Sequence, residues 1–200
     1  LAARAGARVD EVLVMDASRQ GRHTNAYVAG VGPTRVVVLY DTLLQSHPPD
    51  EVVSILAHEL GHWRRDHVLK GTLLAGAGAF LGCFVLAALL RRMAGRPSWN
   101  LSCPSDPAGL PAIAFLAWLA AWAAVPVESA LTRRFEREAD ADALALTADP
   151  QAFIASEKRL VRDNLLDVAP PPAWVWMFAT HPTPVERIEA AERWAVTRGP

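Results

Sequence analysis

Residues 58–62 read HELGH and lie inside a segment whose apolar residues recur at helical spacing. Two histidines four positions apart lie one above the other on a helix face, so both imidazoles can bind one zinc ion at about 2.0–2.1 Å. Glu59 follows the first histidine and can reach a water activated by that metal, as a general base does. His58 and His62 are therefore predicted metal ligands, and Glu59 is the predicted catalytic base. Gly61 weakens the helix by about 1 kcal/mol relative to alanine, which a close neighbour or an approaching ligand would explain.

A catalytic zinc ion needs a third protein ligand and one position left open for water. The pattern HExxHxxGxxH would require glycine at position 65 and histidine at position 68, but this sequence has Arg65 and Val68. His67 is one residue out of that register. The remaining option is a carboxylate from a later helix.

Residues 135–140, which read FEREAD, offer such a carboxylate. Glu136 and Asp140 are four positions apart and share one helix face, so one can bind zinc while the other orients a ligand from behind. Glu138 points about 200° away from Glu136 on the same helix. The spacing alone also allows a solvated, charged helix face here.

Two stretches of 20 residues carry no charge, residues 71–90 and residues 108–127. Each is about as long as a helix needs to be to cross the hydrocarbon core of a bilayer. The first contains Gly78-x-x-x-Gly82, a spacing of small residues that lets membrane helices approach closely. We therefore expect a transmembrane helical hairpin. The alternative is a buried hairpin in a soluble protein, which the prolines of the second stretch keep open.

The rest of the chain has the pattern of short strands followed by helices. Runs of β-branched residues and a Gly-Pro turn near residues 30–33 predict a small, partly antiparallel sheet. The expected strands are residues 9–16, 25–31 and 35–40, and the expected helices are a charged helix over 128–146, a helix over 150–166 with Asp149 as N-cap, and a last helix over 184–196. The sequence starts at Leu1 without a signal-peptide pattern, and we expect an upstream part to be missing.

Composition narrows the class of protein. The 200 residues are 52% hydrophobic, with 20 Lys and Arg against 21 Asp and Glu and a net charge of −1. This balance excludes a disordered chain and gives nucleic-acid binding no electrostatic support. The two cysteines, Cys83 and Cys103, are too few for a disulfide framework.

Five blocks, taken in order, resemble the zinc CAAX prenyl endopeptidases and the related bacterial heat-shock-type integral membrane metalloproteases. They cover nearly the whole chain, and the Asn-Ala-Tyr and Asp-Thr-Leu-Leu sequences favour the CAAX branch. The blocks are HTNAY at 23–27, VLYDTLL at 38–44, HELGHW at 58–63, FEREAD at 135–140 and HPTPVER at 181–187.

The resemblance implies an α+β fold that is mainly helical. It implies a single gluzincin-type zinc metallopeptidase domain over residues 1–200, with a small N-terminal sheet. The transmembrane hairpin of residues 71–90 and 108–127 would be inserted between the HExxH motif and the third zinc ligand. One zinc ion per chain is expected.

The resemblance also assigns roles to individual residues. It places the third zinc ligand at Glu136, with Asp140 supporting the site from the second shell of contacts. It brings His181 and Arg187 near the zinc, where they would hydrogen-bond the oxyanion or a neighbouring carboxylate. It further implies that the edge strand at residues 25–27, which are Asn25, Ala26 and Tyr27, pairs with the substrate backbone.

A spanning hairpin would put both of its ends on one side of the membrane. Positive charges near the membrane on that side outnumber those on the opposite loop, so the positive-inside rule places the active site in the cytoplasm. The first set is Arg64, Arg65, Lys70, Arg133, Arg134 and Arg137, and the second is Arg91, Arg92 and Arg96.

The predicted function is zinc-dependent hydrolysis of peptide bonds by an integral membrane enzyme, with CAAX-type processing of prenylated C-termini as the specific possibility. The family's eukaryotic members have several more spans than the two expected here, which leaves a prenylated substrate open. The alternatives are general quality control of membrane proteins, a zinc-stabilised membrane scaffold without turnover, and a soluble metalloprotease. A peptide or protein substrate and membrane lipid are the expected partners, and the oligomeric state is open.

Overall fold

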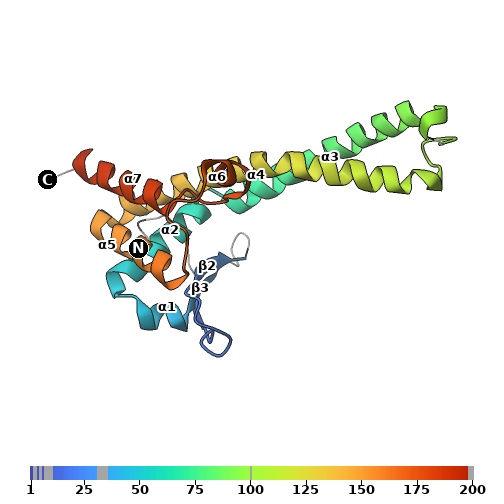
Figure 1. Ribbon diagram of the computed structural model, residues 1–200. Helices are drawn as coiled ribbons and strands as arrows, with labels where there is room; N and C mark the ends of the chain where they lie inside the picture. The colour runs from blue at the N-terminus through green and yellow to red at the C-terminus, as the bar shows by residue number, and fades with distance from the viewer. Residues whose placement is uncertain (2–3, 5, 7–10, 31–35, 100, 198–200) are drawn as a thin grey trace. The chain divides into compact units, whose positions relative to one another are not determined.

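The computed structural model describes residues 1–200 except 2–3, 5, 7–10, 31–35, 100 and 198–200. The chain divides into two compact units, one formed by residues 1–67 with 129–200 and the other by residues 68–128. Figure 1 shows the helices and strands of both units. The fold is mainly helical with one small sheet, as predicted.

The sheet of the first unit has three strands in the order β1-β3-β2. β1 (Glu11–Met15) pairs with β3 (Val36–Tyr40) in parallel, and β2 (Ala26–Ala29) pairs with β3 in antiparallel orientation. β3 lies in the centre and buries Val37 and Leu39, because valine and leucine suit a strand that is covered on its faces. The expected partly antiparallel sheet is present, and β2 is one of its edges. Residues 9–10, 31 and 35 of the expected strands, and most of the turn at 30–33, lie outside the described residues.

Helix α2 (Pro49–Arg64) is the element around which the first unit packs. Prolines precede and start it, and Asp50 and Glu51 lie in its first turn, where acidic side chains favour a helix. One of its faces covers the sheet and α1 (Asp41–Ser46), which the sequence did not predict. Another face packs on α4 (Leu110–Thr147), α5 (Pro150–Asp163) and α7 (Pro184–Thr197). The main core consists of Ala57, Leu60, Ala143, Leu144, Leu146, Phe153, Ile154 and Ala191.

The later helices begin close to the predicted positions. Asp149 is the N-cap of α5, and its carboxylate accepts a hydrogen bond from the backbone N–H of Ala152 at 2.9 Å. α7 ends one residue beyond the expected end of the last helix. α6 (Pro172–Phe178) forms from the aromatic segment before residue 179.

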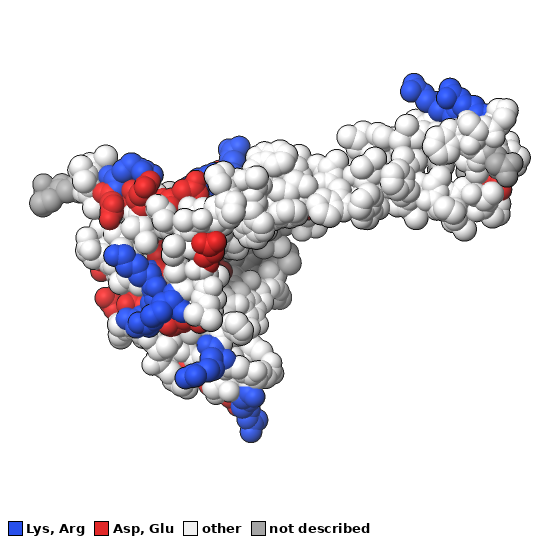
Figure 2. All heavy atoms as spheres, viewed as in Figure 1, with Lys and Arg blue, Asp and Glu red and all other residues white. Residues whose placement is uncertain are grey.

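The second unit contains most of α3 (His67–Met93), two short 3₁₀ helices and the first part of α4 (Leu110–Thr147). The 3₁₀ helices are η2 (Pro97–Trp99) and η3 (Pro107–Gly109), and Asp106 caps η3 by accepting from the N–H of Ala108. Both long helices are long and apolar enough to cross a membrane. Their large side chains are exposed, including Phe80 at 68% and Trp118 at 56%, so these helices are not the buried core of a soluble protein. Figure 2 shows that the hairpin surface is almost free of charged atoms between its ends.

Two details of the second unit differ from the sequence prediction. The apolar stretch at 108–127 and the charged helix at 128–146 form one continuous helix, with Pro126 inside it. Proline removes a single intrahelical hydrogen bond, and the alanine- and leucine-rich sequence on both sides favours the helix strongly enough to continue. The glycines at 78 and 82 do not mediate close packing within the described chain, because no atom lies within 4 Å of where a Cβ would be.

Candidate metal centre

Three side chains from two helices bring their ligand atoms together. His58 and His62 lie on α2, and Glu136 lies on α4. The two histidine Nε2 atoms are 3.1 Å apart. Glu136 places Oε2 at 3.4 Å from Nε2 of His58 and Oε1 at 3.3 Å from Nε2 of His62. Among the described residues, these three form the group of His, Cys, Asp and Glu that could hold a metal ion.

These separations fit a zinc ion. Ligand atoms bound tetrahedrally at about 2.0–2.1 Å lie about 3.3–3.4 Å apart, close to the three distances between these side chains. Oε2 of Glu136 is buried and accepts no hydrogen bond from the described residues, although buried carboxylate oxygens are normally satisfied. Two neutral imidazoles and one carboxylate are also a donor set typical of catalytic zinc.

Gly61 lets the two helices approach closely enough to form this group. A Cβ at this position would lie 3.0 Å from the backbone Cα and O of Ala139 and 3.2 Å from Cβ of Asp142. A backbone cannot move aside as a side chain can, so any larger residue would push α2 away from α4. The close neighbour expected from the helix-weakening glycine is therefore the backbone of α4, one turn from Glu136.

A buried charge cluster supports His58 from the side opposite the ligand atoms. Nδ1 of His58 is 2.7 Å from Oδ1 of Asp140. The guanidinium of Arg187, from α7, donates to both carboxylate oxygens of Asp140 and, at 2.8 Å, to Glu157 of α5. It also lies over the ring of Phe153 at 5.5 Å. Asp140 thus fixes the orientation of the His58 ring, and Arg187 joins α7 to α4 and α5 behind it.

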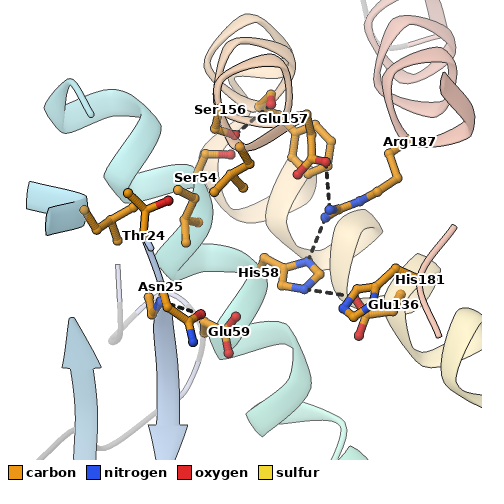
Figure 3. Close-up of a pocket in the computed structure, with 15 residues that line it drawn as sticks. Thr24, Asn25, Ser54, His58, Glu59, Glu136, Ser156, Glu157, His181 and Arg187 are labelled. Carbon is orange, nitrogen blue, oxygen red and sulfur yellow. Dashed lines mark hydrogen bonds and ion pairs between the residues drawn. The ribbon is translucent and has the colours of Figure 1, made fainter. Parts of the chain in front are cut away.

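A pocket of about 150 Å³ opens beside the group. Figure 3 shows that His58, Glu136 and His181 meet on one side of it, with Glu59 and Asn25 also along its wall. Polar and apolar side chains both line it, which suits a peptide better than a purely hydrophobic ligand. The remaining lining residues include Thr24, Ala26, Leu43, Ser54, Ile55, Ser156 and Leu160.

Glu59 and His181, which both line the pocket, have shifted pKa values. Burial raises the pKa of the Glu59 carboxyl, against the opposing charges of His58 and His62. Burial lowers the pKa of His181, against the attraction of Glu136, whose Oε2 lies 3.4 Å from its Nε2. A raised carboxyl pKa favours proton uptake, and a neutral imidazole can donate an N–H hydrogen bond.

The segment that carries His181 is held in place by α4. Arg133 is buried and donates from Nη1 to the backbone carbonyls of Val175 and Ala179. Oγ of Ser129 donates to the carbonyl of Met177 at 3.0 Å. The sequence had suggested only a membrane-flanking charge for Arg133. Its contacts with residues more than 40 positions later leave no pattern in the sequence around it.

The structure places the remaining predicted residues at the edge of the sheet. Asn25 and Ala26 line the pocket at the start of β2, whose outer edge is unpaired within the described sheet. Tyr27 does not line the pocket; its ring packs edge-on against Tyr40 with the centroids 6.3 Å apart. The sequence did not predict that Glu157 belongs to the charge cluster behind His58. A glutamate on the apolar face of α5, next to Phe153, was the signal that could have revealed it.

Residues 1–195 match the profile of peptidase family M48. The chain belongs to peptidase family M48. It is 31% identical to the "Uncharacterized metalloprotease YhfN" of Bacillus subtilis over 96% of this chain and 46% of that protein. It is 32% identical to the "CAAX prenyl protease 1 homolog" of Oryza sativa over 96% of this chain and 45% of that protein. The resemblance to the CAAX proteases and their bacterial relatives is confirmed.

A solved structure has the same fold. The crystal structure of S. mikatae Ste24p superposes with a TM-score of 0.80 and 27% sequence identity, over 96% of this chain and 48% of that one. The M48 chain therefore spans about half the length of the relatives it matches. Membership of this family of metalloproteases implies a metal ion. His58, His62 and Glu136 form a group that could hold one.

Proposed function

We propose that this M48 chain is a zinc-dependent membrane endopeptidase. The observation that carries the proposal is the meeting of the ligand atoms of His58, His62 and Glu136 beside a pocket that Glu59 lines. A structural zinc site closes its fourth position with another protein ligand and needs no carboxylate base beside it. A pocket lined by a half-buried carboxylate that can act as a base therefore favours catalysis over a scaffold without turnover.

Several residues in and beside the pocket have roles in the proposed peptide hydrolysis. A zinc ion held by the three ligands would supply Lewis-acid activation of water and of the scissile carbonyl. Glu59 removes the proton from the attacking water and passes it to the leaving amine, which its raised pKa favours. His181 donates a hydrogen bond to the developing oxyanion. Asp140 holds His58 in the tautomer that leaves Nε2 free to bind the metal.

The substrate backbone is proposed to pair with β2. An extended peptide added to the outer edge of this strand would run past Asn25 and Ala26, which line the pocket. Pairing through backbone hydrogen bonds selects an extended conformation rather than a particular sequence. This mode of binding suits both prenylated C-termini and membrane proteins that undergo quality control.

Two substrate classes are compatible with this site. Relatives named CAAX prenyl proteases favour processing of prenylated C-termini. General quality control of membrane proteins is the second candidate, because the bacterial relative is named only as a metalloprotease and the edge strand imposes little sequence selection.

One assay tests the function and separates the substrate classes. The chain, purified in detergent, is given a farnesylated CAAX peptide, the same peptide without the lipid, and an unrelated peptide. We expect chelation to lower hydrolysis at least about 100-fold and zinc to restore it. At least about tenfold higher kcat/KM for the farnesylated peptide would support CAAX processing, and equal rates would support quality control. A zinc-loaded chain that cleaves none of the three contradicts the proposed function.

The same assay tests the edge-strand contact. N-methylation of a substrate amide removes a donor, and only alternate amides of an antiparallel partner face β2. We expect methylation at alternate positions near the scissile bond to lower kcat/KM by about tenfold, the effect of losing about one hydrogen bond. Equal effects at consecutive positions would contradict pairing on β2.

We also propose that the protein is integral to the membrane, with α3 and the first part of α4 crossing it and the metal centre on the cytoplasmic side. Arg133 is buried on the catalytic side, so its charge contributes less to the positive excess than its position in the sequence suggested. The exposed Cys103, in the loop between the two helices, reports the orientation directly.

In intact bacterial cells, a membrane-impermeant maleimide is expected to label Cys103 from outside. The Cys103→Ser variant should lose this labelling. With Cys103→Ser in the same chain, Arg193→Cys on the exposed face of α7 should react only after the cells are permeabilised. The reverse pattern of accessibility would overturn the cytoplasmic placement.

A further inference from the structure

His67 lies directly behind the zinc ligand His62. A turn separates α2 from α3, and Asp66 adopts the left-handed conformation there, with φ of +52°, which aspartate tolerates better than most residues. The turn brings His67, the first residue of α3, back against the last turn of α2. Its side chain is buried and stacks on Phe135, with ring centroids 4.3 Å apart and the planes 10° from parallel.

Both nitrogens of His67 face polar atoms. Nδ1 is 3.0 Å from Nδ1 of His62, and Nε2 is 3.3 Å from Oε2 of Glu138. Arg65 and Arg134 each donate to Glu138, at 3.3 and 3.0 Å. Glu138, which points away from Glu136 on the same helix, therefore lies at the far end of this series of contacts.

A metal ion bound at Nε2 of His62 would fix the direction of these hydrogen bonds. His62 can bind zinc through Nε2 only as a neutral imidazole, so its proton must be on Nδ1. That N–H then donates to Nδ1 of His67, which must be unprotonated in order to accept. The proton of a neutral His67 consequently lies on Nε2 and donates to Glu138. One arrangement of protons satisfies every contact in the series.

We propose that His67 is a positioning residue for zinc, linking His62 to the carboxylate of Glu138. The inference rests on the proposed function only in that zinc is the metal held by His62. Each histidine ligand would then be hydrogen-bonded to a carboxylate. His58 contacts Asp140 directly, and His62 contacts Glu138 through the imidazole of His67. This series of hydrogen bonds from His62 through His67 to Glu138, called the relay below, fixes the ring of His62. It also raises the basicity of His62 as a ligand.

The test is the zinc dissociation constant of the detergent-purified chain, measured by competition with a fluorescent chelator. His67→Phe keeps the stack on Phe135 but has no nitrogen, and we expect about 10–100-fold weaker binding, typical of a lost outer partner of a ligand. His67→Asn places an amide oxygen near the position of Nδ1, and we expect it to restore affinity to within about fivefold of wild type.

Glu138→Gln should weaken zinc binding, because it removes the charge at the end of the relay. Its matched control is Glu189→Gln, which removes the partner of another i,i+4 arginine pair far along α7 and should leave the affinity unchanged. Circular dichroism of each variant establishes that it is folded.

The outcomes separate the relay from the proposed function. Unchanged affinity in His67→Phe, or equal losses in the phenylalanine and asparagine variants, would overturn the relay, because packing alone would then explain the position. If wild type binds zinc and the variants rank as expected but no peptide is cleaved, the relay stands and the endopeptidase proposal fails. A wild-type chain that binds no zinc overturns both.

Discussion

Glu59→Gln is expected to lower kcat for peptide hydrolysis by about 10²–10⁴-fold, the usual contribution of a general base. Glutamine has nearly the same shape and still lines the pocket, but its amide cannot take a proton from water. The residue is not one of the three metal ligands, so bound zinc should remain at the wild-type level. The measurement is the turnover of a cleaved peptide beside the zinc content of each purified sample.

Glu189→Gln, an exposed change on α7, is the control for the loss of a negative charge and should leave turnover at the wild-type value. Wild-type turnover in the Glu59 variant would contradict the assignment of the base. Loss of zinc together with activity would mean that Glu59 acts in metal binding rather than in proton transfer.

Arg187→Met is expected to reduce the free energy of unfolding by about 3–5 kcal/mol, the cost of breaking a buried ion pair from one side. The guanidinium is 13% exposed and lies between the carboxylates of Asp140 and Glu157, which are 8% and 7% exposed. Methionine fills a similar volume but leaves both carboxylates buried without their cation. Urea unfolding of the detergent-solubilised chain, followed by tryptophan fluorescence, measures the change.

Arg193→Met is the matched control on the same helix, because Arg193 forms an exposed pair with Glu189; we expect a change within about 0.5 kcal/mol. Adding Glu157→Gln to Arg187→Met should recover part of the loss, since it neutralises one of the two stranded carboxylates. Equal effects of the two arginine variants would show that the buried cluster contributes no more than a surface pair.

The sequence predicted which segments form helices better than it predicted where one helix ends and the next begins. The period of apolar residues identified α2, α5 and α7, because burial of one face imposes that period. It did not reveal that the stretches on either side of residue 127 form one helix. Their change from apolar to charged composition reflects a change of surroundings, and the backbone hydrogen bonds of α4 continue regardless.

Short-range patterns likewise indicated the proposed metal ligands but not the contacts that hold them in place. The i,i+4 spacing of His58 and His62 is a property of one helix, so the sequence alone determined it. The shared face of Glu136 and Asp140 was visible too. Which of the two carboxylates meets the Nε2 atoms of both histidines depended on the packing of α4 against α2.

The sequence by itself determined the helix of the proposed metal ligands, the proposed catalytic carboxylate beside them and the two apolar helices, because each depends on spacing or composition within one segment. Only the tertiary structure decided that Gly61 sets the distance between α2 and α4, that Arg187 bridges Asp140 and Glu157, and that His67 lies behind His62. These contacts join side chains from different helices. Their geometry follows from packing in three dimensions, which no pattern within a single segment records.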